Sequence, residues 1–562
     1  MGRGTFRSQN KVGETMSFQT DSSSATTFDP TVTFLPGLSD RVSWDLGDGS
    51  GYVADSSLSY SYDDTGTTKT VTLRTNKLSN LYGGTFVSDN IVGNLNMTGW
   101  DNLGGNFYIY SNSGLTGITH TTSTQTFSNY RVNNCNLIGN HDMSMFPNLG
   151  GLFLTYNNFD LTGITHTAST QVFSQYRADS CNLIGNHDMS MFPNLGGRFQ
   201  VNNNANLNSI THTASTQVFN IYYAKFCNLI GNHDMSMFPN LGGEFWLYNN
   251  ANLTGITHTA STQVFTNYWV YGTGLIGNHD MSMFPNLGGS FYMSTNPSLT
   301  SITHTASTQT FSQYYVFDNN LIGNHDMSML PGLGGDFHIH TNTNLTSITH
   351  TASTQVINDY YAFNCDLTGN HDMSMFPNLG GDFRIYNNAN LTGITHTAST
   401  QVYTNYWATS CDLTGNHDMS MLTGLGSFIE LNSNTNLTSV TFPMSTGTFR
   451  NTVPSGWVFD KDSFGMDSCN LDGSTNFFTL SGITMDVNST YGATILLTNN
   501  NMLQSEVDGY LIDFSAITSN NITRWSGVTL NIGGSNAAPS GAGLAAVAYL
   551  TGVTTQWTIT TS

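Results

Sequence analysis

Residues 183–197 read LIGNHDMSMFPNLGG, and this stretch returns almost unchanged every 46 residues between about residues 91 and 436. Its aspartate recurs in the same GNHDMSM context at Asp142, Asp188, Asp234, Asp280, Asp326, Asp372 and Asp418. A second block, LTGITHTASTQ, recurs at the same interval and contributes a histidine each time: His120, His166, His212, His258, His304, His350 and His396. A period of this length is typical of solenoids, in which each repeat buries its apolar face against its neighbours. A long repeated surface favours binding to an extended partner over a single catalytic pocket.

The composition of the 562-residue chain limits its partners. Charged residues make up 9% of the sequence, far below the roughly 25% that is usual in soluble proteins. The formal net charge is −21, and seven of the 15 Lys and Arg residues lie in the first 77 positions. The repeats therefore have few cations to neutralise phosphate, which argues against a nucleic-acid partner. No stretch approaches the ~20 apolar residues that a membrane span requires.

The N-terminal segment, MGRGTFRSQNKVGETMSFQT, is polar and lacks the apolar region of a secretory signal. If Met1 is the native start, we expect the protein to stay inside the cell or to leave it within an assembly such as a virion. Residues 1–28 would then form a small basic arm that anchors the protein to the particle.

The cysteines do not have the spacing of a disulfide framework. Five of the six share one repeat position, namely Cys135, Cys181, Cys227, Cys365 and Cys411. Equivalent residues two coils apart are roughly 9.5 Å from each other at ~4.8 Å per coil, which is too far for a disulfide. We expect buried free thiols, and no metal site or other cofactor.

Each 46-residue unit divides into two coils of 23 residues. One coil has the pattern F-x-x-Y-x-A-x-x-C-x-L over residues 173–183, and the other has F-x-V-x-x-N-x-x-L over residues 199–207. Both patterns resemble those of the leucine-rich repeat family, with aromatic residues replacing many leucines, over residues 78–450. The resemblance implies a mostly β fold: a right-handed solenoid of about 16 coils with a parallel β-sheet, roughly 75 Å long. A parallel β-helix is the alternative.

Both ends of the repeat region differ from the repeats. Residues 29–77 contain WDLGDGS, a Tyr-Ser-Tyr and a Lys-Thr-Val-Thr-Leu strand, and they resemble a PKD-type immunoglobulin-like β-sandwich. There Asp45 and Asp48 either form turns, which is the common role of such carboxylates, or hold calcium. Residues 451–562 contain an insertion of 12 residues before Cys469 and helical spacing at 505–517 and 540–550. We expect a C-terminal cap with short helices, similar to caps of bacterial and phage-borne leucine-rich repeat proteins.

Two charged patterns suggest chemistry. Aligning the coils places His120 opposite Asp142, and the equivalent residues of later repeats likewise, which predicts a His–Asp ladder. The alignment does not decide whether the ladder lies on the inward or the outward face. Met143 favours His141 as the inward residue. A structural ladder is preferred over a metal or catalytic site, because a catalytic site is normally built once. Asp336 and Asp382, two coils apart, would suit the carboxylate pair of a polysaccharide depolymerase, but solvated strand acids are the preferred interpretation.

The positions that vary between otherwise identical coils give the strongest functional signal. They are the outward positions of the strands, and aromatic residues dominate them where solvent would favour Thr, Lys or Glu. Aromatic side chains serve as anchors for protein hot spots and sugar faces. We expect an exposed aromatic strip that binds ligand, composed of Tyr223, Trp246, Tyr248, Trp269, Tyr271, Tyr315, Phe317, His338, His340, Tyr361, Phe363, Arg384, Tyr386 and Trp407.

These observations predict a non-enzymatic recognition or adhesion protein. The expected setting is a phage virion surface or fibre, with a host-surface glycan or protein receptor as the partner and virion proteins bound through the N-terminal region. A bacterial cell-surface adhesin and a depolymerase are the alternatives. A homo-oligomer that buries the aromatic strip is a further possibility.

Overall fold

The computed structural model describes residues 13–22, 27–62, 67–399, 401, 403–422, 428–441, 464–465, 494–520, 528–552 and 556–562. It contains 41% strand and 5% helix. The chain forms two compact units, Met1–Leu275 and Ile276–Ser562. Each unit is a β-solenoid of stacked parallel coils, which confirms the predicted fold class; a parallel β-helix is equally compatible with this architecture.

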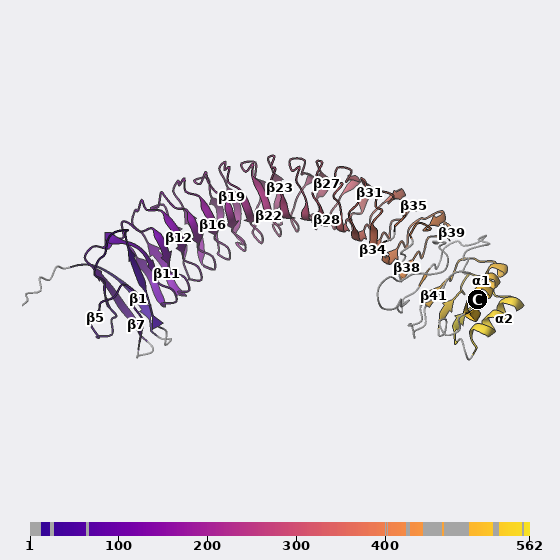
Figure 1. Cartoon of the computed structure of the whole chain (residues 1–562), viewed down its shortest axis with the longest axis horizontal. Coiled ribbons are helices and arrows are strands. Elements are labelled where there is room, and N and C mark those ends of the chain that lie inside the picture. The colour runs from indigo at the N-terminus through magenta and orange to yellow at the C-terminus, as the bar shows by residue number, and fades with distance from the viewer. Residues whose placement is uncertain are drawn as a thin grey trace, which may run out of the picture. The chain divides into compact units, whose positions relative to one another are not determined.

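Within each unit, every described coil contributes one strand to a parallel sheet that runs along that unit and is called here the continuous sheet. In unit 1 the strands lie side by side (Figure 1), and their inward Phe and Tyr side chains form the core. The strands are β8 (Leu81–Thr85), β10 (Gly105–Tyr108), β12 (Phe127–Arg131), β14 (Gly151–Leu154), β16 (Phe173–Arg177), β18 (Gly197–Gln200), β20 (Phe219–Tyr223), β22 (Leu241–Trp246) and β24 (Phe265–Trp269). In unit 2 they are β26 (Gly289–Tyr292), β28 (Phe311–Tyr315), β30 (Gly335–His338), β32 (Ile357–Tyr361), β34 (Leu379–Arg384), β36 (Tyr403–Trp407), β38 (Phe428–Glu430), β40 (Phe464–Gly465), β41 (Thr494–Leu496), β42 (Thr529–Asn531) and β43 (Thr558–Thr560).

On the second side of each coil the strands pair only two by two, so the 46-residue repeat is visible in the hydrogen bonding. The pairs in unit 1 are β13 (Gly139–Asp142) with β15 (Leu161–Thr165), β17 (Gly185–Asp188) with β19 (Leu207–Thr211), and β21 (Gly231–Asp234) with β23 (Leu253–Thr257). Those in unit 2 are β25 (Gly277–Asp280) with β27 (Leu299–Thr303), β29 (Ile322–Asp326) with β31 (Asn344–Thr349), β33 (Thr368–Asp372) with β35 (Asn390–Thr395), and β37 (Gly415–Asp418) with β39 (Leu437–Thr441). This side is extended, as the absence of helical periodicity predicts.

The Asn and Cys positions of the two coil patterns satisfy backbone groups at the bend after each main strand. The Asn158 amide donates to the carbonyls of Val132 and Thr155, at 2.8 and 2.6 Å, and its oxygen accepts from Leu137 N–H. In the alternate coil the Cys181 thiol donates to Thr155 O at 3.4 Å. The five cysteines that the structure describes are free and buried, as predicted; Cys469 lies outside the described residues.

The N-terminal domain covers the open edge of both sheets of unit 1. Its strand β1 (Glu14–Asp21) pairs antiparallel with β7 (Thr68–Thr75) and with β9 (Ile91–Asn96), which in turn pairs with β11 (Gly114–Thr119). Strand β3 (Thr31–Phe34) pairs antiparallel with β8. The domain thus begins before residue 29 and satisfies strand edges that would otherwise be available for aggregation. Residues 1–12 of the expected arm lie outside the described residues.

The two aspartates of the WDLGDGS segment act as turn residues. Asp45 accepts from Gly47 N–H at 3.1 Å, and Asp48 accepts from Ser50 N–H at 2.8 Å and from the Tyr60 hydroxyl. Burial alone would raise the pKa of Asp48, but these hydrogen bonds lower it to about 2. Both aspartates thus have the turn-forming role that the sequence favours for them.

The C-terminal cap of unit 2 contains the two predicted helices, α1 (Gln504–Asn520) and α2 (Gly541–Leu550), which lie side by side (Figure 1). Val507, Leu511 and Leu550 are buried between them and the last strands, and the terminal strand β43 follows Trp557. The predicted insertion before Cys469 lies outside the described residues except for β40.

The predicted His–Asp ladder is wrong. Asp142 pairs in register with Thr165 rather than with a histidine, is exposed, and accepts from Ser144 N–H. The histidines instead turn inward, where two of them bind one tyrosine hydroxyl, with N···O distances of 2.7 to 3.0 Å. The His–Tyr–His groups are His120–Tyr130–His141, His166–Tyr176–His187 and His212–Tyr222–His233 in unit 1, and His304–Tyr314–His325, His350–Tyr360–His371 and His396–Tyr406–His417 in unit 2.

Hydrogen-bond satisfaction assigns the protons of each group. The Nδ1 atom of His166 is buried without a partner. We assign its proton to Nε2, because an unpaired buried N–H would lose a hydrogen bond. Nε2–H of His166 then donates to Tyr176, whose hydroxyl donates to Nε2 of His187. Burial keeps both rings neutral: it lowers the pKa of His166 well below its usual value and that of His187 to about 4.

Replacing one central tyrosine tests this buried network. We expect Tyr222→Phe to destabilise its coils by about 2 kcal/mol, because His212 and His233 each lose their only tyrosine partner in the core. Tyr223→Phe, one residue along and outward-facing, is the matched control and should change little. Hydrogen exchange of β19 to β21 measures the effect locally, and equal protection in both variants would contradict it.

The neutral histidines also predict an acid-sensitive solenoid. Their folded pKa values, about 4 for His141, His187 and His233, lie below the value of about 6.5 for an exposed histidine. The unfolded chain therefore binds protons first, and stability is lost as the pH falls from about 6.5 towards 4, by about 3 kcal/mol per histidine. Buried Asp89, whose pKa is raised to about 8, acts in the opposite direction.

We expect the melting temperature to fall between pH 6.5 and pH 5, a window in which exposed carboxylates remain ionised. A melting temperature that stays constant across that window would contradict the assignment of neutral core histidines.

Candidate binding surface

The candidate surface is the outward face of the continuous sheet, which the alternation of strand side chains sets apart from the core. Three columns of side chains run along it, each at a fixed position of the coil. In unit 1 the first column includes Tyr223, Trp246 and Trp269, which are in register. The second column lies two residues later and includes Lys225, Tyr248 and Tyr271, and the third lies two residues earlier and includes Arg198, Ile221 and Glu244.

The aromatic rings of unit 1 stack face to face along the columns. The centroids of Tyr223 and Trp246 are 3.9 Å apart at an interplanar angle of 8°, and those of Trp246 and Trp269 are 4.8 Å apart at 5°. In the second column Tyr248 and Tyr271 are 4.4 Å apart at 8°. The ammonium group of Lys225 lies 4.5 Å from the Trp246 ring, in cation–π contact.

Unit 2 continues the same arrangement with histidines inside the stacks. In its first column His338 stacks on Tyr315 at 4.5 Å and on Tyr361 at 4.1 Å, and the Arg384 guanidinium lies between the rings of Tyr361 and Trp407 at 4.7 and 4.4 Å. The second column stacks at 4.2 to 4.6 Å through Phe317, His340, Phe363 and Tyr386. Burial lowers the pKa of His338 to about 3 and that of His340 to about 4, so both are neutral aromatic members of the stacks.

The structure brings all predicted site residues onto this face, but their exposure differs from the prediction. None of them is fully exposed, and Tyr223 and Tyr248 retain only 6% of their accessible surface. Each ring covers the face of the next, because the coil spacing of ~4.8 Å is close to the stacking distance. A ligand therefore meets ring edges and hydroxyls, whereas the Trp246 Nε1 atom is buried and has no hydrogen-bond partner among the described residues.

Three carboxylates occupy the third column of unit 2 on consecutive strands. Asp336 is in register with Asp359, and Asp359 with Asp382. The hydroxyls of Tyr315 and Tyr361 donate to Asp336 and Asp382 at 3.0 and 3.1 Å. Burial, and then the charges of Asp336 and Asp382, raise the pKa of Asp359. Asp336 and Asp382, the pair singled out in the sequence, are thus separated by Asp359.

Sequence reasoning singled out Asp336 and Asp382 but did not include the third column in the variable binding face. Its residues Arg198, Glu244 and Asp359 differ from coil to coil like those of the other columns. Their variation could have been recognised in the sequence, because each of these residues stands next to an inward residue of its strand in an otherwise constant context.

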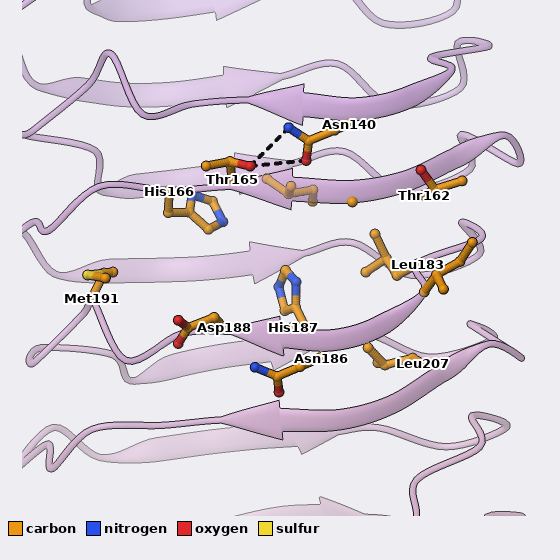
Figure 2. Close-up of a pocket in the computed structure, with 13 residues that line it drawn as sticks. Asn140, Thr162, Thr165, His166, Leu183, Asn186, His187, Asp188, Met191 and Leu207 are labelled. Carbon is orange, nitrogen blue, oxygen red and sulfur yellow. Dashed lines mark hydrogen bonds between the residues drawn. The ribbon is translucent and has the colours of Figure 1, made fainter.

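A hollow lies on the second side of the coils of unit 1. Strands β15 and β17 belong to different two-stranded sheets, and a cavity of about 420 Å³ opens between them (Figure 2). Backbone hydrogen bonds close it at both ends, from Ile184 N–H to Thr162 O and from Ser169 N–H to Met191 O. His166 and His187 line it, with ring centroids 6.1 Å apart, but both bind Tyr176. The cavity therefore follows from the pairing of coils two by two.

No protein-family model matches the chain, and no curated protein or solved structure is similar to it at the significance required. Across the described residues, His, Cys, Asp and Glu side chains form no cluster of three or more that could hold a metal ion. Neither described helix, α1 nor α2, combines the length and apolar character of a transmembrane helix.

Removing the central acid of the third column tests the charge repulsion on this face. The raised folded pKa means that Asp359 contributes most to stability when protonated and loses that contribution as the pH rises. We expect Asp359→Asn to raise the melting temperature at pH 7 to 8, with a smaller difference near pH 4. Asp318→Asn, at an exposed bend, is the control. An unchanged or lower melting temperature at neutral pH would contradict the repulsion.

Proposed function

We propose that this chain is a non-enzymatic recognition protein that binds a host-surface glycan or protein through the outward face of its continuous sheet. The observation that carries the proposal is the contrast between an almost constant scaffold and a variable face. Neighbouring 46-residue repeats share their bends, their histidines and their second-side strands, whereas the three columns differ in nearly every coil. A face serving only sheet stability would gain from uniform ladders.

The chemistry of the face supports binding. Stacked rings are held rigid by their neighbours, so they lose little conformational entropy when a ligand covers them. Ring edges and tyrosine hydroxyls provide polar contacts beside apolar surface, a combination found at interaction hot spots.

The finer assignments belong to the same proposal. The coil patterns support membership of the leucine-rich repeat class, and the WDLGDGS segment supports a PKD-type domain. A repeat scaffold closed by a β-domain at one end and helices at the other suits a phage fibre or virion surface protein, with the N-terminal region as its attachment. A bacterial surface adhesin would use the same face in the same way.

A polysaccharide depolymerase is the second candidate, favoured by the acid column of unit 2. Asp359 has a raised pKa beside two further carboxylates, as a general acid requires. It ranks second because Tyr315 and Tyr361 already engage the neighbouring acids. If the wild-type protein released reducing ends from a polysaccharide and Asp359→Asn abolished that release, depolymerase activity would become the preferred function.

Removing single indoles tests the binding surface. We expect Trp246→Ala and Trp269→Ala in unit 1, and Trp407→Ala in unit 2, to weaken binding to a glycan array or to host cells by about tenfold or more. The fold should persist, because these side chains lie outside the core.

Phe159→Ala is the matched control, since Phe159 is an aromatic residue that is 68% exposed at a bend away from this face. Equal binding by all four variants would refute the assigned surface. A wild-type protein that binds nothing and buries the columns in a homo-oligomer would turn the surface into an assembly interface.

A further inference from the structure

The few cations of the repeat region are not scattered. Between residues 78 and 449 the chain has five Lys or Arg residues. All five project from the outward face of the continuous sheet, and four of them belong to unit 1: Arg131, Arg177, Arg198 and Lys225. These four residues of unit 1 are called here the basic strip. They form a positively charged area in a chain whose net charge is −21.

The strip occupies five consecutive coils. Arg131 and Arg177 lie in the first column two strands apart, with Leu154 between them, and are thus separated by about 9.5 Å. Arg198 follows on the next strand and Lys225 on the one after. The only acid among these outward positions is Asp179, which pairs with Arg177 at 2.8 Å.

Tyrosine rings hold two of the arginines, Arg131 and Arg177, at this face. The guanidinium of Arg177 lies 3.9 Å from the Tyr156 ring centroid and that of Arg131 5.2 Å from Tyr108. Arg131 and Arg198 form no ion pair among the described residues. An anion bound at this face would therefore gain charge-assisted contacts with these guanidinium groups.

We propose that the basic strip of unit 1 is the binding site for an acidic polysaccharide, which deepens, and rests on, the proposed binding function of the sheet face. Nucleic acid is a poor fit, because duplex DNA carries one charge per ~1.7 Å and the strip offers at most one cation per coil of ~4.8 Å. An acidic polysaccharide carries one carboxylate per sugar or per pair of sugars, which is a sparser series. An extended glycan also suits a row of stacked strands.

The face of unit 2 supports this assignment by contrast. There Asp336, Asp359 and Asp382 accompany a single Arg384, which is paired with Asp382 at 2.7 Å. A polyanion is repelled from that surface, so the charge pattern directs it to unit 1.

The test uses hyaluronate and polygalacturonate as probes, each compared with its methyl ester, which keeps the sugar backbone and removes the charge. The full-length protein should bind at least one acid form and bind the matching ester about tenfold more weakly or not at all. Binding should weaken at high salt. The double variant Arg198→Gln, Lys225→Gln should lose about tenfold in affinity. Arg41→Gln removes an exposed cation of the N-terminal domain, outside the three columns, and should retain the affinity.

Each contrary result has a distinct meaning. Equal binding of acid and ester, or equal loss in Arg41→Gln, overturns the basic strip as the site but leaves the proposed binding face intact. Polyaspartate binding as tightly as the glycans overturns the glycan in favour of an acidic protein. Binding of neither acid probe at low salt overturns the inference, and the tryptophan variants on cells still test the proposed function independently.

Discussion

Backbone hydrogen bonding between parallel strands of adjacent coils is the constraint on which the rest of this structure depends. It fixes the rise at ~4.8 Å per coil and stacks every residue on its equivalent in the next coil. The Asn158 type of bend satisfies the carbonyls that this arrangement would otherwise leave buried and unpaired. The same rise determines the spacing of the outward rings. Flat side chains at equivalent positions, such as Trp246 and Trp269, stack face to face because the strands place them there.

The interior shows how a repeat can bury polar groups safely. Two histidines and a tyrosine form a neutral group in which one proton is donated at each contact, and the group is repeated along each unit. In the group of Tyr176 the hydroxyl and both Nε2 atoms are satisfied, and only the Nδ1 atom of His166 has no partner among the described residues. The cost of this design is sensitivity to acid, since protonation of His187 in the core would break the arrangement. The exposed aspartates of the GNHDMSM blocks, by contrast, only cap turns.

The outward face separates stability from recognition. The core and bends are nearly constant, so the columns of the sheet can vary without disturbing the fold. Ring stacks contribute to both roles, because they rigidify the face and leave edges and polar atoms for a ligand. The charge of the two units differs on this face: unit 1 holds Arg131, Arg198 and Lys225 without an acidic partner among the described residues, while unit 2 holds the acids Asp336, Asp359 and Asp382. The proposed acidic glycan is assigned to unit 1 on this difference.

The sequence by itself determined the repeat, the 23-residue coil, the inward Phe and Tyr residues, the free thiols and the two terminal helices, because each follows from local periodicity. It also identified the outward positions, since residues on a strand alternate. Three features required the tertiary structure. Register decided that Asp142 meets Thr165 and that His166 turns inward, which alignment of the coils could not show. Contact between coils decided that the aromatic rings cover one another. The pairing of second-side strands two by two, and the cavity between β15 and β17, depend on hydrogen bonds between residues more than 20 positions apart, which no local pattern encodes.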